Sequence, residues 1–241
     1  MILTRRDLIF NDYNFSRLVD ILSIKRALLS VTNDTIAGRD RLFVRGQRLN
    51  PQSIEIDVLL RGDNRREIEK IRKELAKHLY TKEPGKLYTR DSDLYDIAIF
   101  DGEADIAKKL FTAQTTLRFR TLYGYRFGQT KRLTVKSGDI IVPNGAVDTR
   151  GVFACDIKKS TGSIKVTNTH TGDFVKIDYP FEAGGRLIID GENEIVTVNG
   201  YNAMKYVAYE SDFFDLLAGE QNRITIEGAA EMDARYTERW L

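Results

Sequence analysis

Two short acidic clusters are the parts of this 241-residue chain whose residue types and spacing come closest to a catalytic or metal site. Their members are Asp91, Asp93 and Asp96 in the first and Asp190, Glu192 and Glu194 in the second. Carboxylates spaced in this way could bind Ca²⁺ or act as the acid and base of a glycoside hydrolase. The first cluster lacks the glycine and terminal glutamate of a Ca²⁺ loop, and both fall between predicted strands, where Asp favours turns. We therefore prefer a structural role for both clusters, and glycoside hydrolysis is the least favoured functional hypothesis.

Other catalytic signatures fail on spacing. His78 and His170 are the only histidines, and neither has a Cys or Asp at metal-ligand spacing. Residues 124–131 superficially suggest a phosphate loop, but no lysine follows the second glycine. The sequence therefore predicts no catalytic residue, no metal site and no cofactor, in a protein that is not an enzyme.

Composition and charge narrow the class of protein further. The chain has 37 Lys and Arg against 35 Asp and Glu, a net charge of +2, which gives no general attraction to nucleic acid. No stretch approaches the ~20 apolar residues of a membrane span, and the start lacks the apolar run of a signal peptide. We therefore expect synthesis in a reducing cytosol and no membrane partner. Cys155, the single cysteine, lies in an apolar segment and is expected to be a buried structural thiol.

Alternation of apolar and polar residues predicts a mostly β fold. Residues 54–60, 116–122 and 223–227 alternate as half-buried strands do. Residues 163–167 and 174–178 flank a polar turn and are expected to form a hairpin.

One clear helix is expected at about residues 64–80, opened by Asp63 or Asn64 as its N-cap. Its apolar residues are spaced as one helical stripe: Ile68, Ile71, Leu75 and Leu79. The segments 103–111 and 209–217 are ambiguous, and each could contain helix. The fold class is therefore mostly β with one clear helix, either β or α+β.

A polar stretch at residues 127–132 is the best domain boundary, because a block of strands containing the helix gives way there to an all-β block. The predicted domains are residues 1–131 and residues 132–241. The length of the chain suits two domains, since ~100–150 residues is a common domain size.

Aromatic residues leave one binding hypothesis open. A sugar-stacking platform, as in a lectin-like protein, could be built from Tyr123, Tyr125, Tyr201 and Tyr206. Aromatic residues are also enriched in cores and at protein interfaces, and we prefer packing as their role. A stand-alone, lectin-like carbohydrate-binding protein is therefore the alternative hypothesis.

Several segments carry a resemblance that covers nearly the whole chain. They are Ala37–Asp40, Gly85–Tyr95, Val142–Gly145, Leu187–Asp190 with Val196–Gly200, and Phe213–Leu216 with Ala218–Ile224. Their order and composition resemble the distal tail protein family of long-tailed, non-contractile bacteriophages. Arg41 stands where the family usually has a glycine.

The resemblance implies a structural virion protein. The first domain would be a ring-forming β-sandwich with a helix, and the second a galectin-like β-sandwich. Six copies would form a ring that joins the tail tube to the baseplate hub and anchors host-adsorption components. The implied partners are the tail tube protein, a tail-associated hub or lysin protein and a receptor-binding protein. The protein would be made in the cytoplasm of the host bacterium and would reside at the virion tail tip.

A subunit interface is the expected site in such an assembly. A basic strand supplies the candidate residues, which are Arg39, Arg41, Arg45 and Arg48. They could meet acidic residues of a neighbouring copy. Residues 210–241 are one acidic region, with eight Asp and Glu against three Arg.

Overall fold

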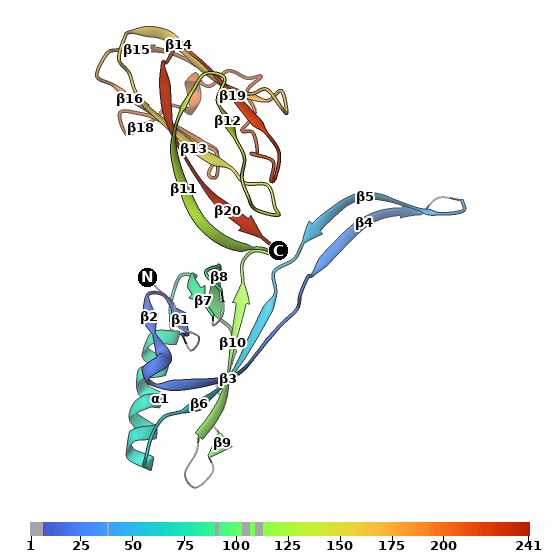
Figure 1. Cartoon of the computed structure of the whole chain (residues 1–241), viewed down its shortest axis with the longest axis vertical. Helices are drawn as coiled ribbons and strands as arrows, with labels where there is room; N and C mark the ends of the chain where they lie inside the picture. The colour runs from blue at the N-terminus through green and yellow to red at the C-terminus, as the bar shows by residue number, and fades with distance from the viewer. Residues whose placement is uncertain (1–6, 38, 90–91, 103–106, 109–112) are drawn as a thin grey trace. The chain divides into compact units, whose positions relative to one another are not determined.

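The computed structural model describes residues 7–37, 39–89, 92–102, 107–108 and 113–241. The chain divides into two compact units, residues 1–127 with Leu241 and residues 128–240. The boundary predicted between residues 131 and 132 falls inside strand β11 (Arg126–Lys136), the strand on which the units divide. Each unit is described by itself (Figure 1).

The first unit combines short strands with one helix. Its strands are β1 (Ile9–Phe10), β2 (Tyr13–Asn14), β3 (Val19–Arg26), β4 (Val31–Ala37), β5 (Leu42–Leu49), β6 (Ser53–Leu60), β7 (Gly85–Tyr88), β8 (Tyr95–Phe100), β9 (Ala107–Lys108) and β10 (Ala113–Thr121). A 3-10 turn, η1 (Phe15–Arg17), precedes β3. The main sheet has the order β3-β6-β10-β8-β7-β1-β2, with β9 beside β10, and these described strands pair antiparallel.

Helix α1 (Arg65–Leu79) covers the apolar face of this sheet. Asn64 caps the helix by accepting the Glu67 N–H at 3.0 Å, while the Glu67 side chain accepts the Asp63 N–H at 2.9 Å. These reciprocal bonds satisfy donors that an isolated helix end leaves free. The predicted stripe is the buried face of the helix and consists of Ile68, Ile71, Leu75 and Leu79.

Asp57 links three strands on the outer face of the same sheet. Its carboxylate accepts the Ser23 hydroxyl of β3 and the Thr116 hydroxyl of β10, both at 2.6 Å. Lys25 approaches the same carboxylate at 3.0 Å. Because these three partners favour the charged form, the pKa of Asp57 is lowered to about 2.

We expect this network to make the free energy of unfolding depend on pH. The folded-state pKa of Asp57 lies below its unfolded value, so its contribution is present above pH 4 and is lost as pH falls towards 2. Asp57→Asn should lower the unfolding free energy at pH 7 by about 1–2 kcal/mol, less than the full shift implies, because the side chain is partly open to solvent. Urea unfolding at pH 7 and pH 2.5 measures this. An equal loss at both values would contradict the role of the carboxylate charge.

The second unit is built from strands apart from one 3-10 turn, η2 (Met204–Tyr206). Besides most of β11 its strands are β12 (Ile140–Ile141), β13 (Gly151–Asp156), β14 (Thr161–Asn168), β15 (Phe174–Phe181), β16 (Arg186–Asp190), β17 (Ile195–Val198), β18 (Tyr201–Asn202), β19 (Asn222–Glu227) and β20 (Glu231–Trp240). One sheet has the order β18-β17-β16-β13-β20-β11 and the other β12-β19-β14-β15. Both contribute buried residues to one core, so the unit is a β-sandwich.

Two buried asparagines hold a long loop against this sandwich. Asn222 accepts the Leu217 N–H at 2.9 Å and donates to the carbonyls of Leu217 and Glu220, both at 3.0 Å. Asn168 donates to Asn222 at 3.0 Å and to the Asp215 carbonyl at 3.1 Å. Both side chains are fully buried, so their amides replace the sheet hydrogen bonds that the loop backbone lacks.

The structure confirms the predicted fold class and most of the predicted elements. The 163–167 and 174–178 segments pair as β14 and β15, and Cys155 is buried, with burial raising its thiol pKa to about 11. The 209–217 segment contains no helix; it is a loop that bridges to Thr149 through Leu216. Most of the ambiguous 103–111 segment lies outside the described residues.

Candidate assembly interface

The hairpin of β4 and β5 is a projecting arm, hereafter the arm, residues 31–49. Figure 1 shows its two strands running together away from the strands that precede and follow them. The two strands pair with each other as a separate two-stranded sheet. The described residues of the arm are all exposed except Val31 and Leu49, which lie at its base and are partly buried. A two-stranded hairpin that no other layer covers has only marginal stability in water. The arm is therefore expected to be stabilised by contact with another surface.

Large apolar side chains are exposed on both faces of the arm. Leu42 and Val44 lie on one face and are 66% and 64% exposed. Phe43 lies on the opposite face, directly across from Ile36, and both are about half exposed. Contiguous exposed apolar residues of this kind mark a protein contact surface. The arm can therefore be covered from two sides.

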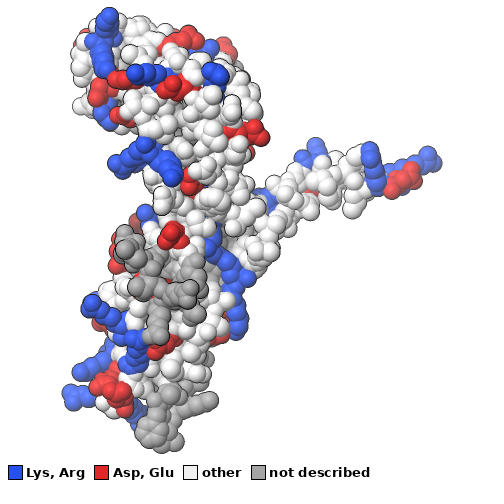
Figure 2. All heavy atoms as spheres, viewed as in Figure 1, with Lys and Arg blue, Asp and Glu red and all other residues white. Residues whose placement is uncertain are grey.

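The structure places the four predicted interface arginines on the arm, and all are exposed. They are Arg39 and Arg41 at the outer turn and Arg45 and Arg48 along β5. The Arg41 guanidinium lies 4.5 Å from the centre of the Phe43 ring. Arg45 is the extra residue of a β-bulge, because the register passes from Thr35 opposite Val44 to Asp34 opposite Gly46. Figure 2 shows basic atoms spaced along the arm with uncharged surface between them and acidic atoms near its outer end.

A cavity of about 310 Å³ opens at the base of the arm, hereafter the base pocket. Asp96 is buried there and forms an ion pair with Arg26; its second oxygen lies 3.5 Å from Arg126 Nε. Burial lowers the pKa of Arg126, and the Arg26 charge adds to that effect while Asp96 opposes it. Among the described residues, this cluster holds two guanidiniums and one carboxylate.

Tyr123 and Tyr125 line the base pocket, with their rings 5.3 Å apart. Gly124 between them packs so closely on the arm that a Cβ would lie 2.6 Å from the Leu49 Cβ. The amide oxygen of Gln52 is buried there without a hydrogen-bond partner among the described residues. The pocket therefore combines aromatic, cationic and polar groups, and its walls are fixed to the arm.

The second unit holds the other two predicted stacking residues. Tyr201 is exposed on β18, whereas Tyr206 packs against Tyr179 with ring centres 4.8 Å apart. The four tyrosines are therefore divided between the two units, and of these four described residues only Tyr123 and Tyr125 contact each other.

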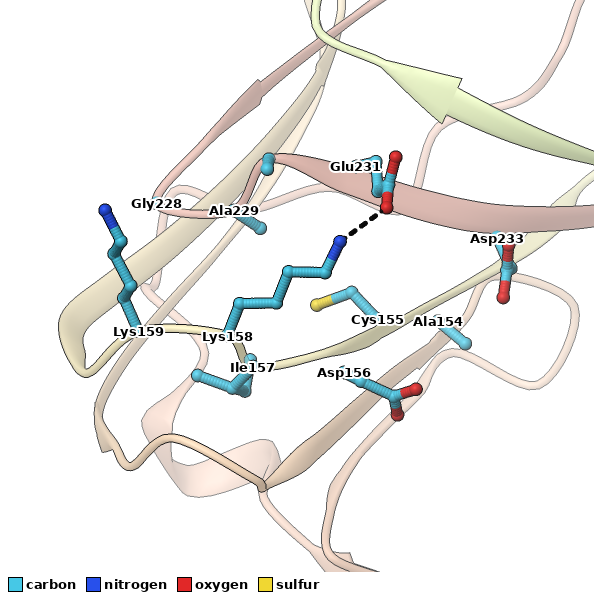
Figure 3. Close-up of a pocket in the computed structure, with 11 residues that line it drawn as sticks. Ala154, Cys155, Asp156, Ile157, Lys158, Lys159, Gly228, Ala229, Glu231 and Asp233 are labelled. Carbon is cyan, nitrogen blue, oxygen red and sulfur yellow. Dashed lines mark hydrogen bonds and ion pairs between the residues drawn. The ribbon is translucent and has the colours of Figure 1, made fainter.

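A second cavity, of about 440 Å³, lies in the second unit between β13 and the β19–β20 turn. Its lining includes Cys155, and Lys158 reaches Glu231 across it at 2.6 Å (Figure 3). No aromatic residue lines this cavity, so it offers no ring on which a sugar could stack.

Several members of the acidic clusters and one histidine contact neighbouring groups in the structure. Asp190 accepts the Asn193 N–H at 3.1 Å in a turn, and Glu194 pairs with Arg150. Asp96 is held by arginine, as described above, and Asp91 lies outside the described residues. His78 stacks on Tyr13 at 3.6 Å.

The described residues lack two further kinds of functional feature. They contain no group of three or more His, Cys, Asp and Glu that could hold a metal ion. Their helices include none that is long and apolar enough to cross a membrane.

Two family models match the chain along most of its length. "Phage tail protein RIFT-related domain" matches residues 11–121, and "Siphovirus-type tail component, C-terminal domain" matches residues 144–240. The chain belongs to the siphophage distal tail protein family. It is therefore a structural component of the phage tail tip.

Individual relatives resemble this chain in sequence and in fold. The distal tail protein of Bacillus phage SPP1 is 26% identical over 196 residues, which cover 76% of this chain and 74% of that protein. The crystal structure of SPP1 Dit, described as a paradigm of the hub adsorption apparatus in phages that infect Gram-positive hosts, has a TM-score of 0.86 at 16% identity, covering 98% and 99% of the two chains. A chain of the phage P2 baseplate in its activated, Ca-bound conformation has a TM-score of 0.57 at 11% identity, covering 98% of each chain.

The apolar part of the arm and the base pocket were not predicted from the sequence. Leu42-Phe43-Val44 is a signal that could have revealed the former, because three consecutive apolar residues in a strand must point to both faces. The base pocket had no comparable signal, since Arg26, Asp96 and Arg126 are far apart in the sequence.

Proposed function

We propose that this distal tail protein assembles as a hexameric ring that joins the tail tube to the baseplate hub and anchors host-adsorption components. The observation that carries the proposal is the arm. It is ordered and long, and apolar side chains are exposed on both of its faces. A free monomer gains nothing from such a surface, whereas an assembly buries it.

A ring requires that each copy offer two different, complementary surfaces. The arm supplies one of them. The outer edge of β3 is a candidate for the second, because β3 is the last strand of its sheet and runs for eight residues with β6 on one side only. Edge strands leave backbone groups available for pairing with another chain. Arm and edge lie on the same unit, which would make that unit the ring-forming part.

Solution mass is the direct test of the ring. Multi-angle light scattering of the purified chain over a range of concentrations, with negative-stain images, should show a closed particle of six copies. A smaller closed particle or an open polymer would overturn the hexamer.

Charge reversal of two arm residues is expected to weaken assembly. Arg45→Glu with Arg48→Glu should shift the mass towards monomer, because arginines that meet acids on a neighbour would become repulsive. The two side chains are exposed, so the melting temperature should stay within a few degrees. Arg65→Glu with Arg66→Glu, exposed on α1, is the matched control. An unchanged mass in the arm variant would remove these two arginines from the interface.

The tail tube protein, the tail-associated hub protein and a receptor-binding protein are the partners we propose. A lectin-like sugar-binding role is the second candidate, favoured by the tyrosine rings and polar groups of the base pocket. Titration of the intrinsic fluorescence with cell-wall sugars distinguishes the two. Saturable binding that Tyr123→Ala abolishes would favour sugar binding.

A further inference from the structure

A loop of the second unit presents an aromatic residue and a carboxylate side by side. These two residues, Tyr209 and Glu210, are hereafter called the knob. Tyr209 is 100% exposed, and Glu210 next to it is also exposed. A fully exposed tyrosine is unusual for a free surface and typical of an interface anchor, since tyrosine is enriched among the residues that dominate binding energy.

The knob is held in place by bonds to the edge strand β15. The Ala208 N–H donates to the Lys176 carbonyl at 2.9 Å, and the Asp212 N–H donates to the Phe174 carbonyl at 2.8 Å. The Ser211 hydroxyl accepts the Lys176 N–H at 3.0 Å. Both ends of the loop are therefore fixed, and its tip loses little freedom on binding.

The base pocket has the complementary chemistry. The Arg26 and Arg126 guanidiniums each carry five N–H donors, more than Asp96 alone can occupy, so they can bind a further carboxylate. Tyr123 can pack against a second aromatic ring. Leu28 lines the pocket and is 93% exposed, which makes it part of an unfilled contact surface.

We propose that the knob of one copy docks in the base pocket of a neighbouring copy. Glu210 would pair with the Arg26 guanidinium, while Tyr209 packs on Tyr123 and Leu28. This contact is heterologous, because knob and pocket are different surfaces of one chain, and such contacts propagate into rings. The inference rests on the proposed ring, and it adds a second subunit contact to the one made by the arm.

Charge favours a second copy as the occupant. The knob begins the acidic region 210–241, with eight acidic residues against three arginines. The tip of the arm is a poorer occupant, because Arg39 and Arg41 flank its Asp40 and would meet the arginines of the pocket.

Cross-linking between two single-cysteine proteins tests this contact. Ala27→Cys, at the exposed rim of the pocket, and Asp212→Cys, exposed beside the knob, leave the contact residues in place. They are made separately in the Cys155→Ala background, one of them carrying a mass tag, and then mixed with a short bismaleimide. The heterodimer should exceed each homodimer about tenfold or more, because an interface raises the effective concentration of the two thiols. Ala27→Cys mixed with Glu220→Cys is the control, since Glu220 is an exposed acid in another turn of the same unit.

The outcomes separate this contact from the ring. Heterodimer at the level of the homodimers would overturn the knob contact, and a wild-type ring seen by light scattering would then leave the proposed function standing. If the cysteine variants give an enriched heterodimer but the wild-type chain never forms particles larger than a dimer, the knob contact is supported and the ring is overturned. An equal enrichment with Glu220→Cys would show that proximity within a crowded assembly, and not docking, causes the cross-link, and would also overturn the contact.

Discussion

Replacing Leu42 and Val44 with aspartate should convert the proposed ring to monomer. Both side chains lie on one face of the arm, and both are about two-thirds exposed in the single chain. Burying an aliphatic side chain is worth about 1.5–3 kcal/mol, so the two together would contribute roughly 3–6 kcal/mol to each contact. A carboxylate buried in their place adds a desolvation cost. The contact should therefore weaken by about 10³-fold or more.

The same exposure predicts that the variant folds normally, because its new carboxylates face water in the monomer. Light scattering gives the mass and thermal unfolding gives the melting temperature. Ile140→Asp with Ile195→Asp is the matched control, since both isoleucines are exposed at about 40% in the second unit. A double arm variant with the wild-type mass would show that this face of the arm is not buried in the assembly.

Asn222→Ala should produce the largest loss of stability, about 3 kcal/mol or more, because several buried groups lose their partner at once. The carbonyls of Leu217 and Glu220, the Leu217 N–H and the Asn168 amide would each lose a hydrogen bond. The Ile141 carbonyl would also lose its 3.2 Å bond, which ties β12 to the loop. The side chain is fully buried, so water cannot replace these bonds without opening the loop.

Urea unfolding of the full chain measures this loss, with tryptophan fluorescence as the signal because Trp240 ends β20. Gln221→Ala is the control, since Gln221 is the exposed neighbour and should change the unfolding free energy by less than about 0.5 kcal/mol. Equal effects of the two substitutions would contradict the account of the network. The loop that carries the knob is held by its bonds to β15. The Gln221→Ala control should therefore leave the knob in place.

Much of the secondary structure could be predicted because its signals are local. The α1 stripe repeats with the helical period and its cap is an adjacent residue, so both were visible in the sequence. Asn199-Gly200 is a dipeptide typical of turns, and both residues have positive φ between β17 and β18. The segment 209–217 was harder, because its bonds go to residues distant in sequence, such as Thr149 and Lys176. Local propensity carries no information about such partners.

The sequence by itself determined the fold class, the single helix, the buried cysteine and the family, since each depends on residue type and on spacing along the chain. The tertiary structure decided that the arm stands uncovered and that Arg26, Asp96 and Arg126 meet in one pocket. It also showed that the asparagine of the Ala218–Ile224 segment, Asn222, is the buried centre of a hydrogen-bond network. These features depend on which distant residues become neighbours, and burial is a property of the folded chain alone.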